Sequence, residues 1–396
     1  MKQTNDQRIY GIIGAVIGDI AGSHHEFKKT FPKKTFKMFC SDSSFTDDSV
    51  MTVALADALL QGKSYEEAMK LWGKKYPAAG FGGNFRKWLK GNKDASTTSA
   101  GNGSGMRISP VGFHGKSLDE VLKMAKEATE PSHNSKEGIK AAQAIAASIF
   151  MARHGESKEA IKAYVESTFK YDLDQTEDDI KNDVQTIGFN QELAANATPV
   201  AIIAFLNGTD YEDVVRTAVS YGGDTDTIAC MAGSIAAAFY GVPVELAEKA
   251  ALYLPTDLLN IINAFDGTAL TNHRVTPPTV KRWSPDTVVV YGCNADDTEG
   301  EAGFYNTHFG RYNRNPQKGF PIHTIGTSMD VIKKDVKDLI AKVKAEPETT
   351  FVIEDVGIGK KTNLGVATMA PLFEPLKDKD NVFFVKEYWE YYKLNA

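Results

Sequence analysis

The sequence predicts an all-α domain followed by a small α/β domain. Its 396 residues exceed what one hydrophobic core usually supports, since single cores stop growing near about 250–300 residues. Apolar residues recur at helical spacing through the first two thirds of the chain, whereas strand-like runs begin only near residue 285. A Pro-rich segment, HRVTPPTVKRWSP, separates the two patterns. We therefore expect a first domain at 1–270, a linker at 271–285 and a second domain at 286–396.

Helices are expected in the first domain wherever this spacing is bounded by Gly, Pro, Asn or Asp. The first two are the apolar stretches that follow Gly14 and Asp48. Eight more are expected at 64–72, 117–127, 137–153, 158–169, 198–206, 211–219, 227–240 and 243–253. The stretches AAQAIAASIFMA and TIACMAGSIAAAFYG are apolar on nearly all sides, which predicts helices buried inside the domain.

The second domain, of about 110 residues, contains strand-like apolar runs. These are TVVVYGCN, TTFVIEDVGIG and NVFFVKEY, with one helix expected at 329–344. Gly357 and Gly359, followed by Lys360 and Lys361, fit either a phosphate-binding turn or an ordinary tight turn. We expect an accessory module whose role, such as recognition of a substrate or a partner, the sequence leaves open.

Composition and charge exclude several classes of protein. The formal net charge of −6 and the pI of about 5.8 argue against non-specific binding to nucleic acid or to acidic lipid. Cys40, Cys230 and Cys293 lie far apart, so we expect no disulfide framework and a reducing compartment. The apolar stretch 9–21 is too short to span a bilayer and follows no cleavable signal pattern. We therefore expect a soluble, cytoplasmic protein.

Two acidic motifs, TDD and GGDTDT, each stand at the start of an expected helix. Together they supply four carboxylates and two hydroxyls, from Thr46, Asp47, Asp48, Asp224, Asp226 and Thr227. Mg²⁺, Mn²⁺ and Ca²⁺ prefer such oxygen ligands, whereas the absence of convergent His/Cys spacing disfavours zinc. Four carboxylates gathered without a cation would repel one another, so we expect two divalent cations.

Each motif alone also fits a simpler interpretation. Asp and Thr are favoured at helix N-termini, where negative charge complements the helix dipole. The glycine-rich loop GNGSGMR could bind a diphosphate through its backbone N–H groups and Arg107, or Arg107 could be a structural ion-pair partner. His133 fits either a ligand contact or a loop hydrogen bond.

Taken together and in order, five motifs within residues 8–265 resemble the ADP-ribosylglycohydrolase family. They are GxxxGDxxG followed by Glu26, TDD, GNGxxMR, a Ser-His pair and GGDTDT. The resemblance implies an all-α bundle with a dinuclear metal site in a cleft, whose ligands are the six TDD and GGDTDT residues named above. It also implies that Glu26, on a mobile loop, contacts the scissile linkage and that His133 lies at the ligand site. By the same resemblance, the loop along the diphosphate and distal ribose consists of Ser104, Gly105, Met106 and Arg107, where many relatives have alanine in place of Gly105.

The resemblance implies hydrolysis of the bond that joins ADP-ribose to a protein or a small acceptor. Two Mg²⁺, or Mn²⁺, are the expected cofactors, and Glu26, Asp47 and Asp226 the expected catalytic residues. Because catalysis in the family needs no C-terminal domain, a second hypothesis stays open: a protein that binds ADP-ribose or blocks an ADP-ribosyltransferase without catalysis. The sequence leaves the acceptor undetermined, since variable loops such as 28–39 line the leaving-group side.

Three polar residues near these motifs are expected to play no direct part. His24 and His25 are expected at the surface of the loop that follows the first helix. Asp19 lies near the C-terminal end of that helix, where the dipole disfavours a carboxylate, so we expect it to make structural hydrogen bonds.

Overall fold

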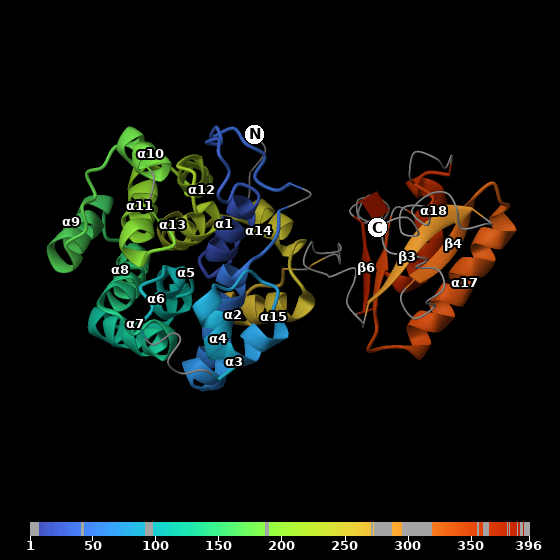
Figure 1. The fold of residues 1–396 in the computed structure, drawn as a ribbon, viewed down its shortest axis with the longest axis horizontal. Coiled ribbons are helices and arrows are strands. Elements are labelled where there is room, and N and C mark those ends of the chain that lie inside the picture. The colour runs from blue at the N-terminus through green and yellow to red at the C-terminus, as the bar shows by residue number, and fades with distance from the viewer. Residues whose placement is uncertain are drawn as a thin grey trace, which may run out of the picture. The chain divides into compact units, whose positions relative to one another are not determined.

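The chain divides into two units of different architecture, Met1–Thr271 and Asn272–Ala396 (Figure 1). The computed structural model describes residues 8–40, 43–91, 98–186, 190–270, 272, 287–294, 319–354, 356–358, 364–377, 379, 381–385, 387–388 and 391. The predicted linker therefore lies outside the described residues except for Asn272. None of the helices in the described part of the chain combines the length and apolar character that a bilayer crossing requires.

The first unit is built from helices. They are α1 (Ile13–Ser23), α2 (Asp47–Gln61), α3 (Tyr65–Lys75), α4 (Gly83–Leu89), α5 (Gly103–Met106), α6 (Ser109–His114), α7 (Leu118–His133), α8 (Lys136–Arg153), α9 (Lys158–Phe169), α10 (Glu177–Gln185), α11 (Ala194–Asn207), α12 (Tyr211–Ser220), α13 (Thr225–Tyr240), α14 (Val244–Ala251) and α15 (Thr256–Asp266). Hydroxyl and carboxylate side chains accept the first backbone N–H groups of many of these helices, which fixes where they begin. Such N-caps are Thr46, Ser64, Ser117, Ser135, Ser157, Thr176 and Asp210.

Helix α13 lies at the centre of this unit and packs against α1, α8, α11 and α12. Its residues from Thr225 to Ala238 are all buried, as the nearly continuous apolar sequence predicts. Two short strands, β1 (Arg8–Ile9) and β2 (Val242–Pro243), pair antiparallel beside it. Strands of two residues are too short to leave an alternating pattern in the sequence, which explains why none was expected there.

Helices α1 and α13 approach each other closely because glycine recurs every fourth residue on α1 (Figure 1). A Cβ atom added to Gly18 would lie 2.0 Å from the carbonyl oxygen of Ala229, and one added to Gly22 would lie 2.5 Å from the Cα of Asp226. Only glycine leaves room for such backbone contact. The contact places the C-terminal half of α1 beside the N-terminus of α13.

The N-terminus of α1 is fixed from a distant part of the chain. The carboxylate of Asp266, the last residue of α15, accepts the N–H groups of Ile12 and Ile13 at 2.8 and 3.0 Å. These two groups belong to the first turn of α1 and have no partner within the helix, so the carboxylate satisfies donors that burial would otherwise leave unpaired.

The second unit contains a four-stranded parallel sheet in the order β4-β3-β5-β6. Its elements are β3 (Thr287–Asn294), β4 (Gly319–Ile325), α17 (Met329–Ala345), β5 (Thr350–Ile353), α18 (Val366–Phe373), the short 3₁₀ helix η3 (Glu374–Leu376) and β6 (Val382–Phe384). Its core includes Val290, Leu339, Phe351 and Phe373, and shares no residue with that of the first unit. Gly357 has a φ of 73°, as a tight turn requires, whereas Gly359, Lys360 and Lys361 lie outside the described residues.

Candidate metal and substrate site

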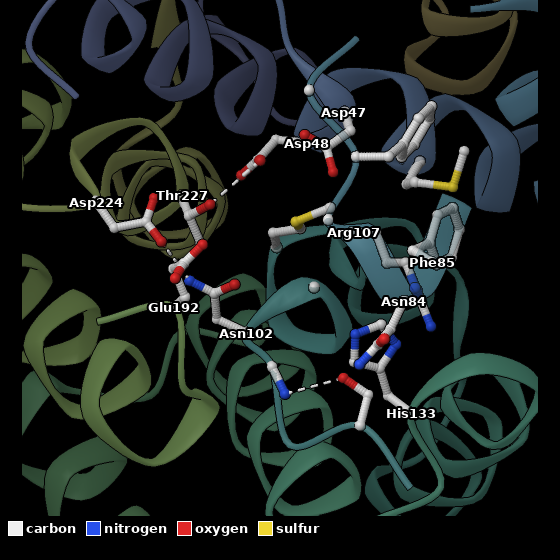
Figure 2. Close-up of a pocket in the computed structure, with 18 of the residues that line it drawn as sticks. Asp47, Asp48, Asn84, Phe85, Asn102, Arg107, His133, Glu192, Asp224 and Thr227 are labelled. Carbon is white, nitrogen blue, oxygen red and sulfur yellow. Dashed lines mark hydrogen bonds between the residues drawn. The ribbon is translucent and has the colours of Figure 1, made fainter. Parts of the chain in front are cut away.

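A cavity of about 500 Å³ opens in the first unit (Figure 2). The start of α2 and the start of α13 line it, together with the segments 80–85 and 98–103. The side chains of Glu26, Arg107, His133 and Glu192 also reach it. Residues of all five predicted motifs thus meet at one cavity, although the motifs are spread over residues 14–227 of the sequence.

The TDD motif forms the N-terminus of α2. Thr46 is the N-cap, and its hydroxyl accepts the N–H of Asp48 at 3.3 Å and donates to Asp19 Oδ1 at 2.8 Å. Asp47 and Asp48 occupy the first turn, where the helix dipole favours a carboxylate. Asp19 Oδ2 accepts the N–H groups of Thr46 and Ser49 at 2.9 and 3.1 Å, so the carboxylate makes the structural hydrogen bonds that were expected of it.

The GGDTDT motif forms the N-terminus of α13. Gly222 and Gly223 adopt positive φ angles of 75° and 77°, and a Cβ on Gly223 would collide with Gln191 Oε1. That oxygen accepts the N–H of Asp224 at 2.9 Å, while Asn102 Nδ2 donates to Asp224 Oδ2 at 2.7 Å (Figure 2). Asp224 is therefore held through both its backbone and its carboxylate.

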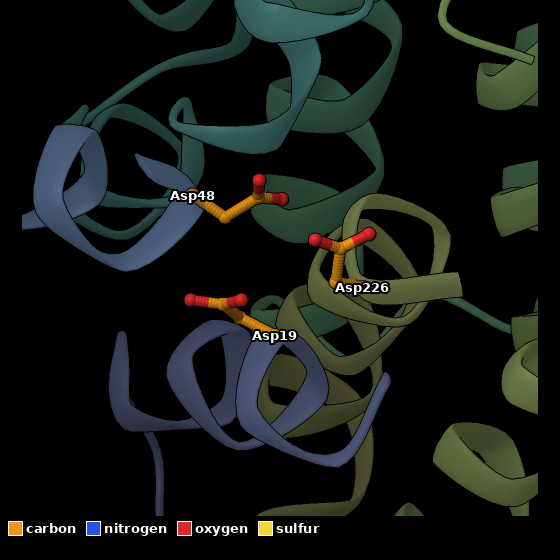
Figure 3. Close-up of side chains that lie close together, drawn as sticks. All are labelled: Asp19, Asp48 and Asp226. Carbon is orange, nitrogen blue, oxygen red and sulfur yellow. The ribbon is translucent and has the colours of Figure 1, made fainter. Parts of the chain in front are cut away.

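The two motifs meet through their side chains. Thr227 Oγ1 donates to Asp48 Oδ2 at 3.2 Å. Carboxylate oxygens of Asp19, Asp48 and Asp226 lie within 4.8 Å of one another (Figure 3), as do those of Glu26, Asp224 and Asp226. Asp226 belongs to both groups, so two cation-sized clusters of oxygen atoms share one carboxylate.

Burial and mutual repulsion make this cluster unfavourable as a set of bare charges. Burial, followed by the negative charge of neighbouring carboxylates, raises the pKa values of Asp47, Asp48 and Asp226 well above the usual range of aspartate. Burial also raises the pKa of Asp224 to about 6, although hydrogen bonds from Asp226 and Asn102 oppose the shift. A bound cation would remove both the repulsion and the desolvation penalty.

Two oxygen atoms indicate that helix capping does not account for the whole cluster. Asp48 Oδ1 and Asp226 Oδ1 are buried and have no hydrogen-bond partner among the residues that the structure describes. A buried carboxylate oxygen without a partner is costly, and hard divalent cations prefer this kind of ligand. The donor set therefore fits one or more divalent cations.

Glu26 lies in the loop after α1, at the rim of the cavity, where its side chain is partly exposed. The next residue, Phe27, adopts a φ of 49°, and its N–H donates to the carbonyl of Gly223 at 2.7 Å. This bond ties the Glu26 loop to the GGDTDT motif. Burial, then the charges of Asp226, Asp19 and Glu192, raises the pKa of Glu26 to about 7.

A different chemistry lines another part of the cavity. Arg107 is fully buried, and its Nη2 donates to Ser132 Oγ at 2.6 Å and to the carbonyl of Ala128 at 3.3 Å. Burial lowers its pKa to about 9. His133 lies beside it, with Nδ1 at 2.9 Å from Ser132 Oγ, and burial together with the Arg107 charge lowers the pKa of His133 well below its usual value.

The remaining predicted residues lie partly at the cavity wall and partly away from it. Met106 lines the cavity, whereas Ser104 and Gly105 lie buried in α5, where a Cβ on Gly105 would meet Met231 Sδ at 2.8 Å. His24 and His25 lie in the loop after α1, as expected, and are not among the described residues that line the cavity; both are half-buried, and the His25 ring packs edge-on against Phe36.

Four residues at or behind the cavity wall were not among the predicted site residues, although Ser132 belongs to the predicted Ser-His pair. They are Asn102, Ser132, Gln191 and Glu192. Asn102 belongs to the GNGSGMR motif, whose middle asparagine could have indicated it. Gln191 and Glu192 precede α11 in a stretch without a recognisable motif, so no signal in the sequence marks them.

The family model described as ADP-ribosylglycohydrolase matches residues 1–272. The chain belongs to the ADP-ribosylglycohydrolase family. This match covers the first unit and ends before the first strand of the parallel sheet.

Similar curated proteins include the ADP-ribosylarginine hydrolase Tri1 of Pseudomonas putida (strain GB-1). It is 26% identical over an alignment that covers 63% of this chain and 76% of the relative. The ADP-ribosylhydrolase ARH3 of Homo sapiens is 25% identical, with 63% of this chain and 90% of the relative covered. Among solved structures, the ADP-ribosylglycohydrolase-related protein complex superposes with a TM-score of 0.51 at 25% identity, covering 67% of this chain and 99% of that one.

Proposed function

We propose that this protein is a hydrolase that releases ADP-ribose from an ADP-ribosylated protein or small-molecule acceptor, by cleaving the glycosidic bond at the proximal ribose. The observation that supports it most directly is the pair of oxygen clusters sharing Asp226, with Glu26 in one of them. The names of Tri1 and ARH3 describe hydrolases of ADP-ribosyl groups, which agrees with this chemistry.

Two Mg²⁺, or Mn²⁺, are the proposed cofactors. One ligand set is Thr46, Asp47 and Asp48, and the other is Asp224, Asp226 and Thr227. When bound, the cations would hold ribose hydroxyl groups and a water. They would stabilise the negative charge that develops on the attacking water or on the leaving atom. The chain's own contribution is to keep these ligands fixed: Asp19 holds Thr46, while Gln191 and Asn102 hold Asp224.

Glu26 is the proposed acid or base. Burial and the neighbouring carboxylates raise the pKa of its carboxyl group to about 7 in the absence of a cation, which brings it toward the range that suits a general acid or base. One of its oxygen atoms would take a proton from the attacking water or give one to the leaving atom. Its position within 4.8 Å of the Asp224 and Asp226 oxygens places this group beside the metal ligands.

The rest of the cavity would bind the ADP-ribosyl group. Met106, Arg107 and His133 line it and are the proposed contacts. Ser104 and Gly105 would act by setting the backbone of the same loop, because their side-chain positions are buried in α5. The buried guanidinium of Arg107 and the N–H groups around it suit a ligand such as a diphosphate, which is rich in anionic oxygen atoms.

Release of free ADP-ribose tests the proposal. Incubation with ADP-ribosylated proteins and Mg²⁺ should release it, and excess EDTA should stop the reaction. Asp224→Asn should keep a residue that caps helices well while losing an anionic ligand, at a cost of several kcal/mol, or more than about 10²-fold in rate. The matched control is Asp210→Asn, which changes the N-cap of α12 outside the cavity and should leave the rate unchanged.

Full activity in EDTA would exclude metal-dependent hydrolysis. The non-catalytic alternative, an ADP-ribose-binding or immunity protein, is motivated by the second unit, which lies outside the family match. Cells challenged with an ADP-ribosyltransferase separate the two. Protection that persists in an Asp224→Ala, Asp226→Ala double variant would favour blocking without catalysis.

A further inference from the structure

Three buried side chains form a hydrogen-bonded chain at the cavity wall. Arg107 Nη2 lies 2.6 Å from Ser132 Oγ, which in turn lies 2.9 Å from His133 Nδ1. All three residues are at most 7% exposed. The order of donors and acceptors along this chain can be worked out from the chemistry of the first member.

Arginine has only donors, so Ser132 Oγ accepts the bond from Arg107. The serine hydroxyl has a single hydrogen, and its one other hydrogen bond among the described residues is with His133 Nδ1. Donation to Nδ1 uses that hydrogen, whereas the opposite arrangement would direct two donors at one oxygen and leave the hydroxyl hydrogen without an acceptor. Ser132 Oγ therefore donates to Nδ1.

A histidine whose Nδ1 accepts a hydrogen bond has its proton on Nε2. Burial and the neighbouring Arg107 charge favour the neutral ring over the imidazolium. Nε2 faces the glycine-rich loop: it would lie 3.0 Å from a Cβ on Gly103 and 3.6 Å from one on Gly101. The missing side chains of these two glycines leave the N–H group room at the cavity wall.

We infer that Ser132 is a positioning residue, which holds His133 in the Nε2–H tautomer so that the ring donates a hydrogen bond to an oxygen of the bound ADP-ribosyl group. The identity of the ligand rests on the proposed function. The tautomer decides binding at the diphosphate, because phosphate oxygens only accept hydrogen bonds at neutral pH. The other tautomer would present a bare nitrogen to them and repel them.

Nitrogen-15 NMR of histidine-labelled protein tests the tautomer without any ligand or turnover. We expect an unprotonated, pyridine-type signal for His133 Nδ1 and a protonated, pyrrole-type signal for Nε2, unchanged from pH 6 to 8. The spectrum of His133→Gln assigns the signals, since the chain has eight histidines. A protonated Nδ1 in the wild-type protein would overturn the inference, whatever the variants do.

Ser132→Ala should shift the His133 signals toward a mixture of tautomers and weaken ADP-ribose binding by about tenfold, the loss of one well-oriented hydrogen bond. Ser132→Thr retains the hydroxyl and should restore both. The matched control is Ser148→Ala, because Ser148 is also a fully buried helical serine, bonded to the carbonyl of Ala144 at 2.8 Å. Ser148→Ala should change neither the tautomer nor the affinity.

The outcomes separate this inference from the proposed function. An unchanged His133 tautomer in folded Ser132→Ala would overturn the inference alone. Wild-type protein that shows the expected tautomer but does not bind ADP-ribose would instead contradict the proposed function, and with it the ligand, while the tautomer that Ser132 sets would stand. If Ser132→Ala does not fold, the wild-type spectrum decides.

Discussion

At the scale of single residues, the acidic side chains around the cavity are of two kinds. Both oxygens of Asp19 accept hydrogen bonds, from Thr46 and from the backbone of Ser49, so this carboxylate organises the start of α2. Glu26 is at the rim of the cavity, and its side chain makes no hydrogen bond to any residue that the structure describes. A carboxyl group that transfers protons must be able to move toward the reacting atoms, whereas a carboxylate that orients metal ligands must be held in place by hydrogen bonds.

Glu26→Gln separates proton transfer from metal binding. The amide keeps the size of the side chain but cannot give or take a proton, so turnover should fall by about 10²–10⁴. Affinity for Mg²⁺ and for ADP-ribose, both measured by calorimetry, should change little, because the two sets of proposed ligands stay intact. Turnover close to that of the wild-type protein would assign the chemistry to the cations and their water.

Which site residues could be predicted from the sequence depends on where their partners lie. Asp48, Asp224 and Asp226 belong to short motifs in which several ligands are neighbours in the chain, so the pattern is visible. Gln191 reaches Asp224 across 33 residues through one side-chain oxygen. A contact of that kind has no local signature, since it arises only when α11 and α13 are packed together.

At the scale of elements, the α1–α13 pair determines whether the cluster can form. Asp19 is on α1 and Asp226 on α13, and their oxygens come together because the glycine face of α1 lets the two backbones touch. Thr225 Oγ1, which donates to the carbonyl of Gly22 at 2.8 Å, fixes the same crossing. A shift of one helix along the other would separate the carboxylates.

Gly18→Ala tests this packing. The added methyl group would lie 2.0 Å from a backbone carbonyl of α13, which cannot move aside as a flexible side chain can. We expect a loss of about 1–3 kcal/mol or more in the free energy of unfolding, measured by urea denaturation, and weaker Mg²⁺ binding. Gly83→Ala is the control, because no atom lies within 4 Å of the Cβ position there. Equal stability of the two variants would contradict the close approach.

Helices and strands were predictable to different degrees for physical reasons. Every helix expected in the first domain has a counterpart, and α9 has the predicted bounds, because apolar spacing and N-cap residues are local signals. Helix α7 continues past the expected end at 127 and through Pro131, held there by the packing of α8. Strand β4 was not among the expected strands; it contains Pro321 and is at the edge of the sheet, where proline is tolerated.

At the scale of the whole molecule, the proposed chemistry and the family match belong to the first unit alone. That unit keeps several carboxylates in its interior, which makes its stability depend on pH and on cations. Burial raises the pKa values of Asp19 and Asp224 to about 6, against about 3.9 for an unfolded aspartate, and burial and neighbouring carboxylates also raise those of Asp48 and Asp226 well above the usual range.

These raised pKa values predict the direction of the pH effect. A group whose pKa is higher in the folded state stabilises it fully below the unfolded pKa, and that stability is lost as the pH rises through the folded pKa. Metal-free protein should therefore unfold at a lower temperature at pH 8 than at pH 6. Mg²⁺ binds the deprotonated carboxylates, so the stabilisation it provides should be larger at pH 8.

Calorimetry gives the melting temperature of the protein under four conditions: in EDTA and in excess Mg²⁺, each at pH 6 and at pH 8. Mg²⁺ should raise the melting temperature of the first unit at pH 8 by on the order of 5 °C. An Asp224→Asn, Asp226→Asn double variant removes two of the titrating groups, so its metal-free form should lose less stability between pH 6 and pH 8 and should not respond to Mg²⁺. A wild-type melting temperature in EDTA that rises over this pH range would show that the carboxylates are stable as bare charges, and that the cluster does not need a cation to fold.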